Sequence, residues 1–218
     1  MSKPTVGASP LSRARRFIQL NGLYVAFSEL GRRIGIIFRR RMLAGKLHCS
    51  DIAIGPRCHL RGLACMRIGK NFQASEGLWL EAVTAHPGQT FSPSIVIGDD
   101  VSISRWCHIA ATHRVEIGDG VLIGSRVLIT DHNHGSYKKR ASDMSIAPAF
   151  RLLDHDGTVV IGRNAWIGDG VVITPNARVG EGAIIGANSV VVGVVPPYAV
   201  AVGAPARCVR SCNPSLIS

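Results

Sequence analysis

The sequence predicts an all-β fold, a parallel β-solenoid, and three observations indicate it. From about residue 50 an aliphatic residue recurs every six positions, usually followed by a small residue. An apolar residue at this spacing cannot stay on one face of an α-helix, but it suits short strands separated by tight turns. Aromatic residues make up only 6% of the 218 residues, so stacked aliphatic side chains must form the core. The stretch 95–195 also lacks the helical segments that an alternating α/β fold requires.

The repeat is clearest in the last third of the chain, where residues 161–196 predict two complete coils of about 18 residues each. Each coil has three flat faces, and a glycine beside the aliphatic residue permits the tight corner. The frame is interrupted by a slip of two residues after Ile109, and its copies before residue 70 are looser. The aliphatic positions are Ile54, Leu60, Ile68, Ile97, Ile103, Ile109, Ile117, Ile123, Ile129, Ile161, Ile167, Ile173, Val179, Ile185 and Val191.

The N-terminal segment 1–46 differs from the repeat region in charge. It holds ten Lys or Arg residues against one acid, Glu29, and so carries most of the formal net charge of +11. A basic face over the whole fold, as in a nucleic-acid-binding protein, is therefore not indicated. Apolar residues recur at spacings of three and four from Phe17 to Phe38, which predicts a basic amphipathic helix over about 13–45. We expect three parts: this helical segment (1–46), the solenoid domain (47–212) and a short tail (213–218).

The helical segment allows three interpretations, which differ in what its apolar face contacts. Residues 17–38 are long enough to span a membrane, but Glu29, Arg32 and Arg33 would be costly there. The two favoured interpretations are a helix lying on an anionic membrane surface and a helix packed on protein. Because the start lacks a signal-peptide pattern, we expect a cytoplasmic protein, at the inner face of the cytoplasmic membrane if the helix binds lipid.

Six cysteines are present, and they form no CxxC pair. We interpret them as small buried hydrophobic residues in a reducing compartment, with a disulfide as the alternative. They are Cys49, Cys58, Cys65, Cys107, Cys208 and Cys212.

The repeat breaks over residues 131–158, and a long loop of this kind is commonly functional. The segment contains His132, His134 and His155. A histidine with a pKa near neutrality is a natural general base for moving an acyl group to a hydroxyl. A metal site is not expected, because zinc needs three or four convergent ligands. We interpret His155 as an ordinary surface or core residue, together with His86, His108 and His113.

Three segments resemble the hexapeptide-repeat acyltransferases: 97–104 (IGDDVSIS), 117–124 (IGDGVLIG) and 161–210. The chain is most similar to the maltose/galactoside O-acetyltransferases and the bacterial polysaccharide and lipopolysaccharide O-acetyltransferases. The resemblance covers about residues 50–210. It implies a left-handed β-helix, although general connection rules favour right-handed crossovers. It also implies a homotrimer that uses acetyl-CoA and binds it between subunits.

The resemblance further implies a histidine base at the start of the excursion. Counting without gaps from residues 121–124 places the base on His134, and a shift of two residues places it on His132. Asp131 could hold the tautomer of the base or, like Asn133, contact the acceptor.

The residues that the resemblance assigns to acetyl-CoA lie after the excursion. Small residues let the thin pantetheine arm approach the backbone, and forked arginine donors suit phosphates. Where the family often has Thr-Lys, this chain has Val192-Gly193, so one phosphate contact is missing or comes from elsewhere. Val200 to Val202 are expected to form a last strand. The expected acetyl-CoA residues are Trp166, Gly168, Asp169, Gly186, Ala187, Arg207 and Arg210.

The acceptor site is expected near residues 75–83. Ser75 stands where sugar-acetylating relatives can have Asn, while Trp79 and Glu81 are candidates to stack on and hydrogen-bond a sugar ring. This departure and the basic helix favour a membrane-associated acceptor. The sequence therefore predicts an O-acetyltransferase that moves acetyl from acetyl-CoA to a sugar hydroxyl of a cell-surface polysaccharide or its lipid-linked precursor, by direct transfer. The alternatives are another acceptor (serine, a sugar amine or an antibiotic) and a non-catalytic scaffold.

Overall fold

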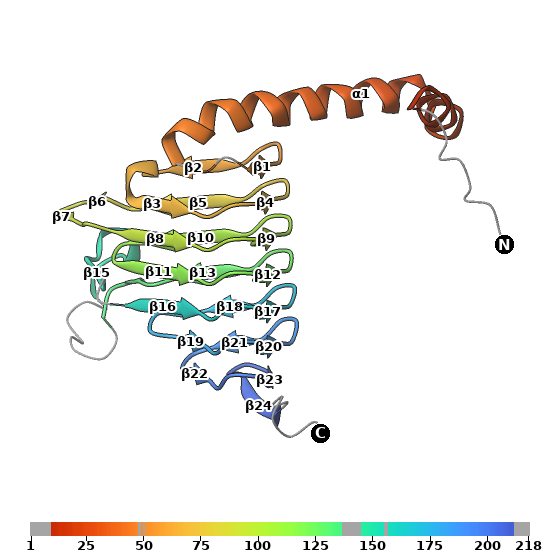
Figure 1. Ribbon diagram of the computed structural model, residues 1–218. Helices are drawn as coiled ribbons and strands as arrows, with labels where there is room; N and C mark the ends of the chain where they lie inside the picture. The colour runs from red at the N-terminus through yellow and green to blue at the C-terminus, as the bar shows by residue number, and fades with distance from the viewer. Residues whose placement is uncertain (1–9, 48, 50, 137–144, 155–156, 212–218) are drawn as a thin grey trace.

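The computed structural model describes residues 10–47, 49, 51–136, 145–154 and 157–211. The chain winds into a triangular prism whose three walls are parallel sheets, with the helix α1 (Pro10–Leu47) lying across the first coil (Figure 1). Successive strands go to different sheets, so each sheet contains every third strand of the coil. The fold is the left-handed parallel β-helix, and the predicted solenoid is confirmed.

We name the three walls sheets A, B and C. Sheet A contains β1 (Ile52–Ile54), β4 (Phe72–Ala74), β9 (Ser102–Ile103), β12 (Leu122–Ile123), β17 (Trp166–Ile167), β20 (Ile184–Ile185), β23 (Ala199–Val202) and β24 (Arg207–Ser211). Sheet B contains β2 (His59–Arg61), β5 (Trp79–Ala82), β10 (His108–Ala111), β13 (Leu128–Thr130), β18 (Val172–Ile173) and β21 (Val190–Val191). Sheet C contains β3 (Met66–Ile68), β8 (Ser94–Ile97), β11 (Arg114–Ile117), β16 (Thr158–Ile161), β19 (Arg178–Val179) and β22 (Val194–Val195). The 3-10 turns η1 (Leu63–Cys65) and η3 (Pro148–Phe150) lie outside the sheets.

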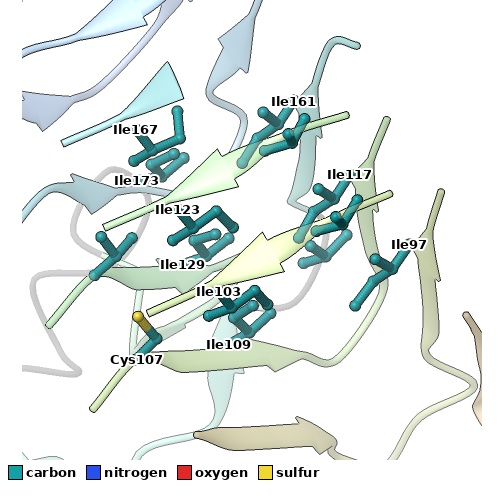
Figure 2. Packing of buried hydrophobic residues seen from close by; sticks show 14 of the residues in the cluster. Ile97, Ile103, Cys107, Ile109, Ile117, Ile123, Ile129, Ile161, Ile167 and Ile173 are labelled. Atoms are coloured by element: carbon teal, nitrogen blue, oxygen red, sulfur yellow. The ribbon is translucent and has the colours of Figure 1, made fainter. Parts of the chain in front are cut away.

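The aliphatic residues of the repeat form the core, as the spacing predicts. Within each sheet they stand in register from coil to coil, for example Ile97, Ile117 and Ile161 in sheet C. Figure 2 shows isoleucines of all three sheets pointing into the prism, and each labelled isoleucine is at most 2% exposed. Burying one such side chain contributes about 1.5–3 kcal/mol, so a chain with few aromatics can still build a stable core.

The corners of the prism are tight because one turn position adopts a left-handed conformation. Along the corner between sheets C and A, six successive turns have positive φ at this position. Glycine and asparagine adopt such angles most readily, and four of the six residues are of these types. The six residues are Asn71, Asp100, Gly120, Asn164, Gly182 and Tyr198.

The corner between sheets B and C, the B–C corner, is the irregular one. The two-residue slip lies here, because Thr112 and His113 connect β10 to β11. The sequence predicted one break in the repeat, and that was wrong: the chain leaves the prism twice at this corner. The first excursion is the hairpin β6 (Ala85–His86) and β7 (Gln89–Thr90), and the second carries β14 (Asn133–His134) and β15 (Leu153–Asp154). The first was missed because it is short and precedes the regular part of the repeat.

Helix α1 caps the first coil with its C-terminal end. Leu47 is buried and Leu43 packs against the core, and the helix contacts β1, η1 and β3. The helical path breaks at Gly22, whose φ and ψ of 79° and 163° are not helical. Within the described residues, no helix is long and apolar enough to cross a lipid bilayer.

The cysteines differ in their exposure to solvent. Cys49 and Cys107 are buried, and all the cysteines within the described residues are free thiols. The interpretation that all six are buried was wrong for Cys208, which is exposed on β24, the last strand, and Cys58 and Cys65 are only partly buried. Cys212 lies outside the described residues.

Candidate active site at the irregular corner

The two excursions of the B–C corner pack against each other and form one projecting arm. The side chain of Gln89 donates to the carbonyl of Leu153 at 3.1 Å and accepts from its backbone N–H at 2.6 Å. His86 Nε2 lies 3.2 Å from the carbonyl oxygen of Arg151. The hairpin β6–β7 therefore supports the strand pair that presents His134.

Asp131 anchors the start of the second excursion. Its side chain is fully buried, and its two oxygens accept hydrogen bonds from the backbone N–H groups of Thr112, His113 and Arg114 at 2.7–3.2 Å. The hydroxyl of Thr112 also donates to it at 3.1 Å. These donors belong to the same corner one coil earlier, so the carboxylate fixes the point at which the chain leaves the prism.

The same carboxylate holds His132. Asp131 Oδ1 lies 2.8 Å from His132 Nδ1. Burial of Asp131 alone would raise its pKa, but the hydrogen bonds from His132 and from the backbone of Thr112 and His113 outweigh burial and lower the pKa. An ionised Asp131 accepts the Nδ1 proton of a neutral His132, and this tautomer leaves Nε2 able to accept a proton.

His134 lies further out on the arm. It is exposed on β14, where it pairs with Leu153 of β15. Its ring meets the ring of His86 edge to face, with centroids 5.7 Å apart. Asn133 is also exposed and pairs with Asp154. His134 is thus the histidine of the pair that can reach groups outside its own prism, whereas the side chain of His132 is only 13% exposed.

The residues expected to bind acetyl-CoA gather along sheet A and the corner between sheets A and B, the A–B corner. Trp166 stands in register with Ile184, which pairs with Val200, and Val200 pairs with Arg210 on the antiparallel strand β24. Gly168 lies against the backbone of Ala187, because a Cβ at Gly168 would come within 2.7 Å of its nitrogen. Gly168, Asp169, Gly186 and Ala187 therefore occupy two stacked turns.

Two of these residues have further contacts. Asp169 Oδ1 accepts the backbone N–H of Ser125 at 2.6 Å, so this carboxylate caps a turn. Arg207 borders a cavity of about 230 Å³ beside β21 and β22. The strand expected at Val200 to Val202 is confirmed as β23, but it is not the last one, because β24 follows it and covers its edge in antiparallel fashion.

Within one chain the histidines and the expected acetyl-CoA residues are apart. The histidines lie at the B–C corner and Trp166 lies on sheet A. Sheet B separates the B–C corner from the A–B corner (Figure 1). A base at the B–C corner and an acyl donor held along sheet A would therefore lie on different faces of one prism.

The expected acceptor residues are divided in the same way. Trp79 and Glu81 lie together on β5 of sheet B, where Trp79 Nε1 donates to Glu81 Oε2 at 2.8 Å. Ser75 lies instead at the A–B corner, in a cavity of about 430 Å³ between this corner and Glu29 and Arg32 of α1. The structure brings Trp79 and Glu81 together and leaves Ser75 apart from them.

Three residues of this region were not selected from the sequence: His86, Gln89 and His108. His108 stands directly beside Trp79 in sheet B, and the six-residue frame could have revealed this pairing. Nothing in the repeat could have placed His86 or Gln89, because the hairpin that carries them lies outside the frame. His155 lies outside the described residues, and among the described residues no group of three or more His, Cys, Asp or Glu could hold a metal ion.

A hexapeptide β-helix with histidines projecting at one broken corner defines a class, the hexapeptide-repeat acyltransferases. The comparisons with known proteins agree. Residues 158–193 match the family model described as bacterial transferase hexapeptide (six repeats). The chain is 37% identical over 159 residues to the Escherichia coli K12 protein named as the lipopolysaccharide biosynthesis O-acetyl transferase WbbJ, covering 72% of this chain and 76% of that protein.

Two further comparisons extend this result. The galactoside O-acetyltransferase of Escherichia coli K12 is 31% identical over 140 residues, which cover 63% of each protein. The structure of the N-acyltransferase AntD from Bacillus cereus, with coenzyme A and a dTDP-amino sugar, superposes with a TM-score of 0.61 at 17% identity, covering 78% of this chain and 85% of AntD. AntD supports the fold. The chain belongs to the hexapeptide-repeat transferase family, and it is an acetyltransferase.

Proposed function

We propose that this protein transfers an acetyl group from acetyl-CoA to a hydroxyl of a sugar in a cell-surface glycan or its lipid-linked precursor, with His134 as general base. The observation that carries the proposal is the single broken corner of an otherwise regular solenoid, where two excursions present an exposed histidine beside a fixed Asp131–His132 pair. The relative named for lipopolysaccharide biosynthesis supports a glycan acceptor.

The chemistry requires one proton carrier and no covalent enzyme intermediate. His134 takes the proton of the sugar hydroxyl as its oxygen attacks the thioester carbonyl. The carbon–sulfur bond then breaks, and the thiolate of CoA receives the proton from the imidazolium. The products are the acetyl ester and free CoA, and the histidine returns to its neutral form. A base positioned in this way contributes about 10²–10⁴-fold in rate.

The active species in this proposal is a trimer with its sites between subunits. The support is the separation within one chain of the histidines from Trp166, Gly168, Asp169, Gly186, Ala187, Arg207 and Arg210. In the trimer the arm of one subunit faces sheet A of its neighbour. Mixing chains that carry His134→Ala with chains that carry Trp166→Ala, an exposed residue of sheet A, tests this arrangement, because activity should reappear only if each site takes residues from two chains.

The main test is release of free thiol from acetyl-CoA in the presence of lipopolysaccharide fragments, capsule fragments and free sugars. His134→Ala should lower turnover by about 10²–10⁴-fold, while Asn133→Ala, which changes an exposed neighbour on the same strand, should have a much smaller effect. If the His132→Ala variant is inactive and the His134→Ala variant is active, the general base is His132, the histidine that Asp131 already holds. A wild-type protein that binds no CoA would contradict the proposed function.

We propose further that α1 lies on an anionic membrane surface. Its apolar residues Leu23, Phe27, Leu30 and Ile34 follow helical spacing, yet each is between 54% and 69% exposed. The paired side chains of Glu29 and Arg32, in contrast, face the first coil of the solenoid across the cavity at Ser75. The helix therefore turns its polar side to its own domain and its apolar side outward. The excess of Lys and Arg over acids in residues 1–46 complements anionic lipid.

Co-sedimentation with vesicles tests this placement. Wild type should sediment with vesicles that contain phosphatidylglycerol, and much less with vesicles of phosphatidylcholine alone. The double variant Leu23→Ser/Phe27→Ser should remain in solution, while Phe150→Ser, which removes an exposed aromatic side chain from the arm, should sediment like wild type. If the double variant instead changes the oligomeric state and leaves sedimentation unaltered, the apolar face joins subunits.

A further inference from the structure

The outer face of sheet B carries a row of rings that runs along the prism from one strand to the next. His59, Trp79 and His108 stand in register on the adjacent strands β2, β5 and β10. The ring centroids of Trp79 and His108 are 4.9 Å apart, and those of His59 and Trp79 are 6.1 Å apart. We call these three residues, with Glu81 and Arg61, the sheet B strip.

Charged and polar groups run parallel to the rings. Glu81 receives the indole N–H of Trp79 at 2.8 Å and lies 3.7 Å from the guanidinium of Arg61. Arg61 and Glu81 are themselves neighbours in the register of sheet B. A flat apolar ring beside a carboxylate and a guanidinium is the combination that binds a sugar, because the ring covers the apolar face of a pyranose while the polar groups take its hydroxyls.

Strand β10 begins at His108 and leads to the B–C corner, where the backbone N–H groups of Thr112 and His113 donate to Asp131. His108 is partly buried, and this burial lowers its pKa; the nearby Glu81 opposes the shift and the nearby His132 adds to it. His108 thus lies within electrostatic range of both the carboxylate of the strip and the histidine at the corner. A neutral imidazole at this position can both donate and accept a hydrogen bond.

The length of the strip sets the size of the ligand. Adjacent strands of a sheet are about 4.8 Å apart, so the rings of His59 and His108 are separated by about 10 Å along the prism. That distance exceeds one sugar ring. The far end of the strip is the first coil, which α1 covers (Figure 1).

We infer that the sheet B strip is an extended acceptor subsite that holds a glycan chain of at least two sugars, with the acetylated sugar at the B–C corner and the rest of the chain directed toward α1. This inference rests on the proposed function and adds the form of the substrate. A polymer or lipid-linked oligosaccharide fits such a strip, whereas a free monosaccharide would leave most of it uncovered. The direction is also consistent with α1 on the membrane, because a lipid-linked chain would then run from the bilayer to the base.

The kinetic test uses a ladder of oligosaccharides of about one to six sugars, released by mild acid from bacterial lipopolysaccharide. For wild type, kcat/KM should rise roughly 10-fold or more between one sugar and three, as expected for one or two added ring contacts. Trp79→Ala should abolish this rise with length. Trp106→Ala is the matched control, because Trp106 is similarly exposed but lies at the A–B corner, and it should keep the rise. Equal kcat/KM for all lengths in wild type would overturn the inference.

A binding measurement separates failure of the strip from failure of the proposed function. The double variant Trp106→Phe/Trp166→Phe leaves Trp79 as the single tryptophan of the chain. Titrating it with the same ladder, without acetyl-CoA, should change the fluorescence of Trp79 saturably, and at lower concentrations for longer fragments. Saturable binding without turnover would keep the strip and contradict the proposed acetylation of that glycan. The absence of any saturable change along the ladder would refute the strip, whatever the turnover.

Discussion

Large apolar side chains are buried in the solenoid but exposed on helix α1. In the solenoid Ile97, Ile117 and Ile161 stack in one sheet and are at most 2% exposed. On α1, Leu23 and Phe27 are more than 60% exposed. Each coil of the solenoid is covered by the next coil of the same chain, whereas most of α1 extends past the solenoid (Figure 1). The coils of the solenoid therefore bury one another's apolar residues, whereas the described residues leave those of α1 exposed.

This difference predicts that the same kind of substitution lowers the free energy of unfolding by different amounts in the two regions. Ile129→Ala, within the stacked core, should lower the free energy of unfolding by about 2–5 kcal/mol. Leu30→Ala on the exposed face of α1 should change it by less than about 0.5 kcal/mol. Urea unfolding followed by the β-sheet signal in circular dichroism measures both. Similar losses for the two variants would mean that α1 is part of the cooperative core.

The glycines at the corners of the prism test how closely the coils of the solenoid are stacked. At Gly118 a Cβ would lie 2.7 Å from the backbone nitrogen of Arg163 in the next coil, so two coils would have to separate. Gly118→Ala should therefore destabilise the solenoid by about 1–3 kcal/mol, measured by the same urea titration. Unchanged stability would show that the stacked corners can adjust to an extra methyl group.

The buried carboxylate at the irregular corner should make stability depend on pH. The pKa of Asp131 is lowered in the folded protein, so its contribution is fully present above the unfolded pKa of about 3.9 and is lost as the pH falls through the folded pKa. Asp131→Asn should cost about 1–3 kcal/mol at pH 7. Melting temperatures of the two proteins should converge as the pH is lowered below about 4; a constant difference would contradict the role given to the charge.

The smallest expected effect is a slight stabilisation, opposite in sign to the losses above, and it concerns helix α1. Apart from the adjacent residues and the backbone of the helix itself, no atom of the described residues lies within 4 Å of a Cβ at Gly31. The helix interior favours alanine over glycine by about 1 kcal/mol. Gly31→Ala should raise the helical signal in circular dichroism slightly and leave the urea midpoint of the solenoid unaltered. A shifted midpoint would show that α1 and the solenoid unfold together.

The site was less predictable than the fold. The repeat located the long excursion and its histidines, because a break in a regular frame is visible in the sequence. It gave no sign that Gln89 and His86 come from a second excursion at the same corner, or that Asp131 binds three backbone N–H groups of the coil before it. Those contacts join residues about 20 to 65 positions apart outside the six-residue frame.

By itself the sequence determined the solenoid, its aliphatic core, the place of its main break and the helical character of the N-terminal segment. These follow from local rules, since a six-residue spacing permits only one way to bury its apolar residues. Only the tertiary structure decided that His132 is held by Asp131, that His134 projects on a supported arm, that Ser75 lies apart from Trp79, and that α1 turns its apolar face outward. The reason is that each of these depends on which coils and corners stack side by side, and stacking is a property of the folded chain.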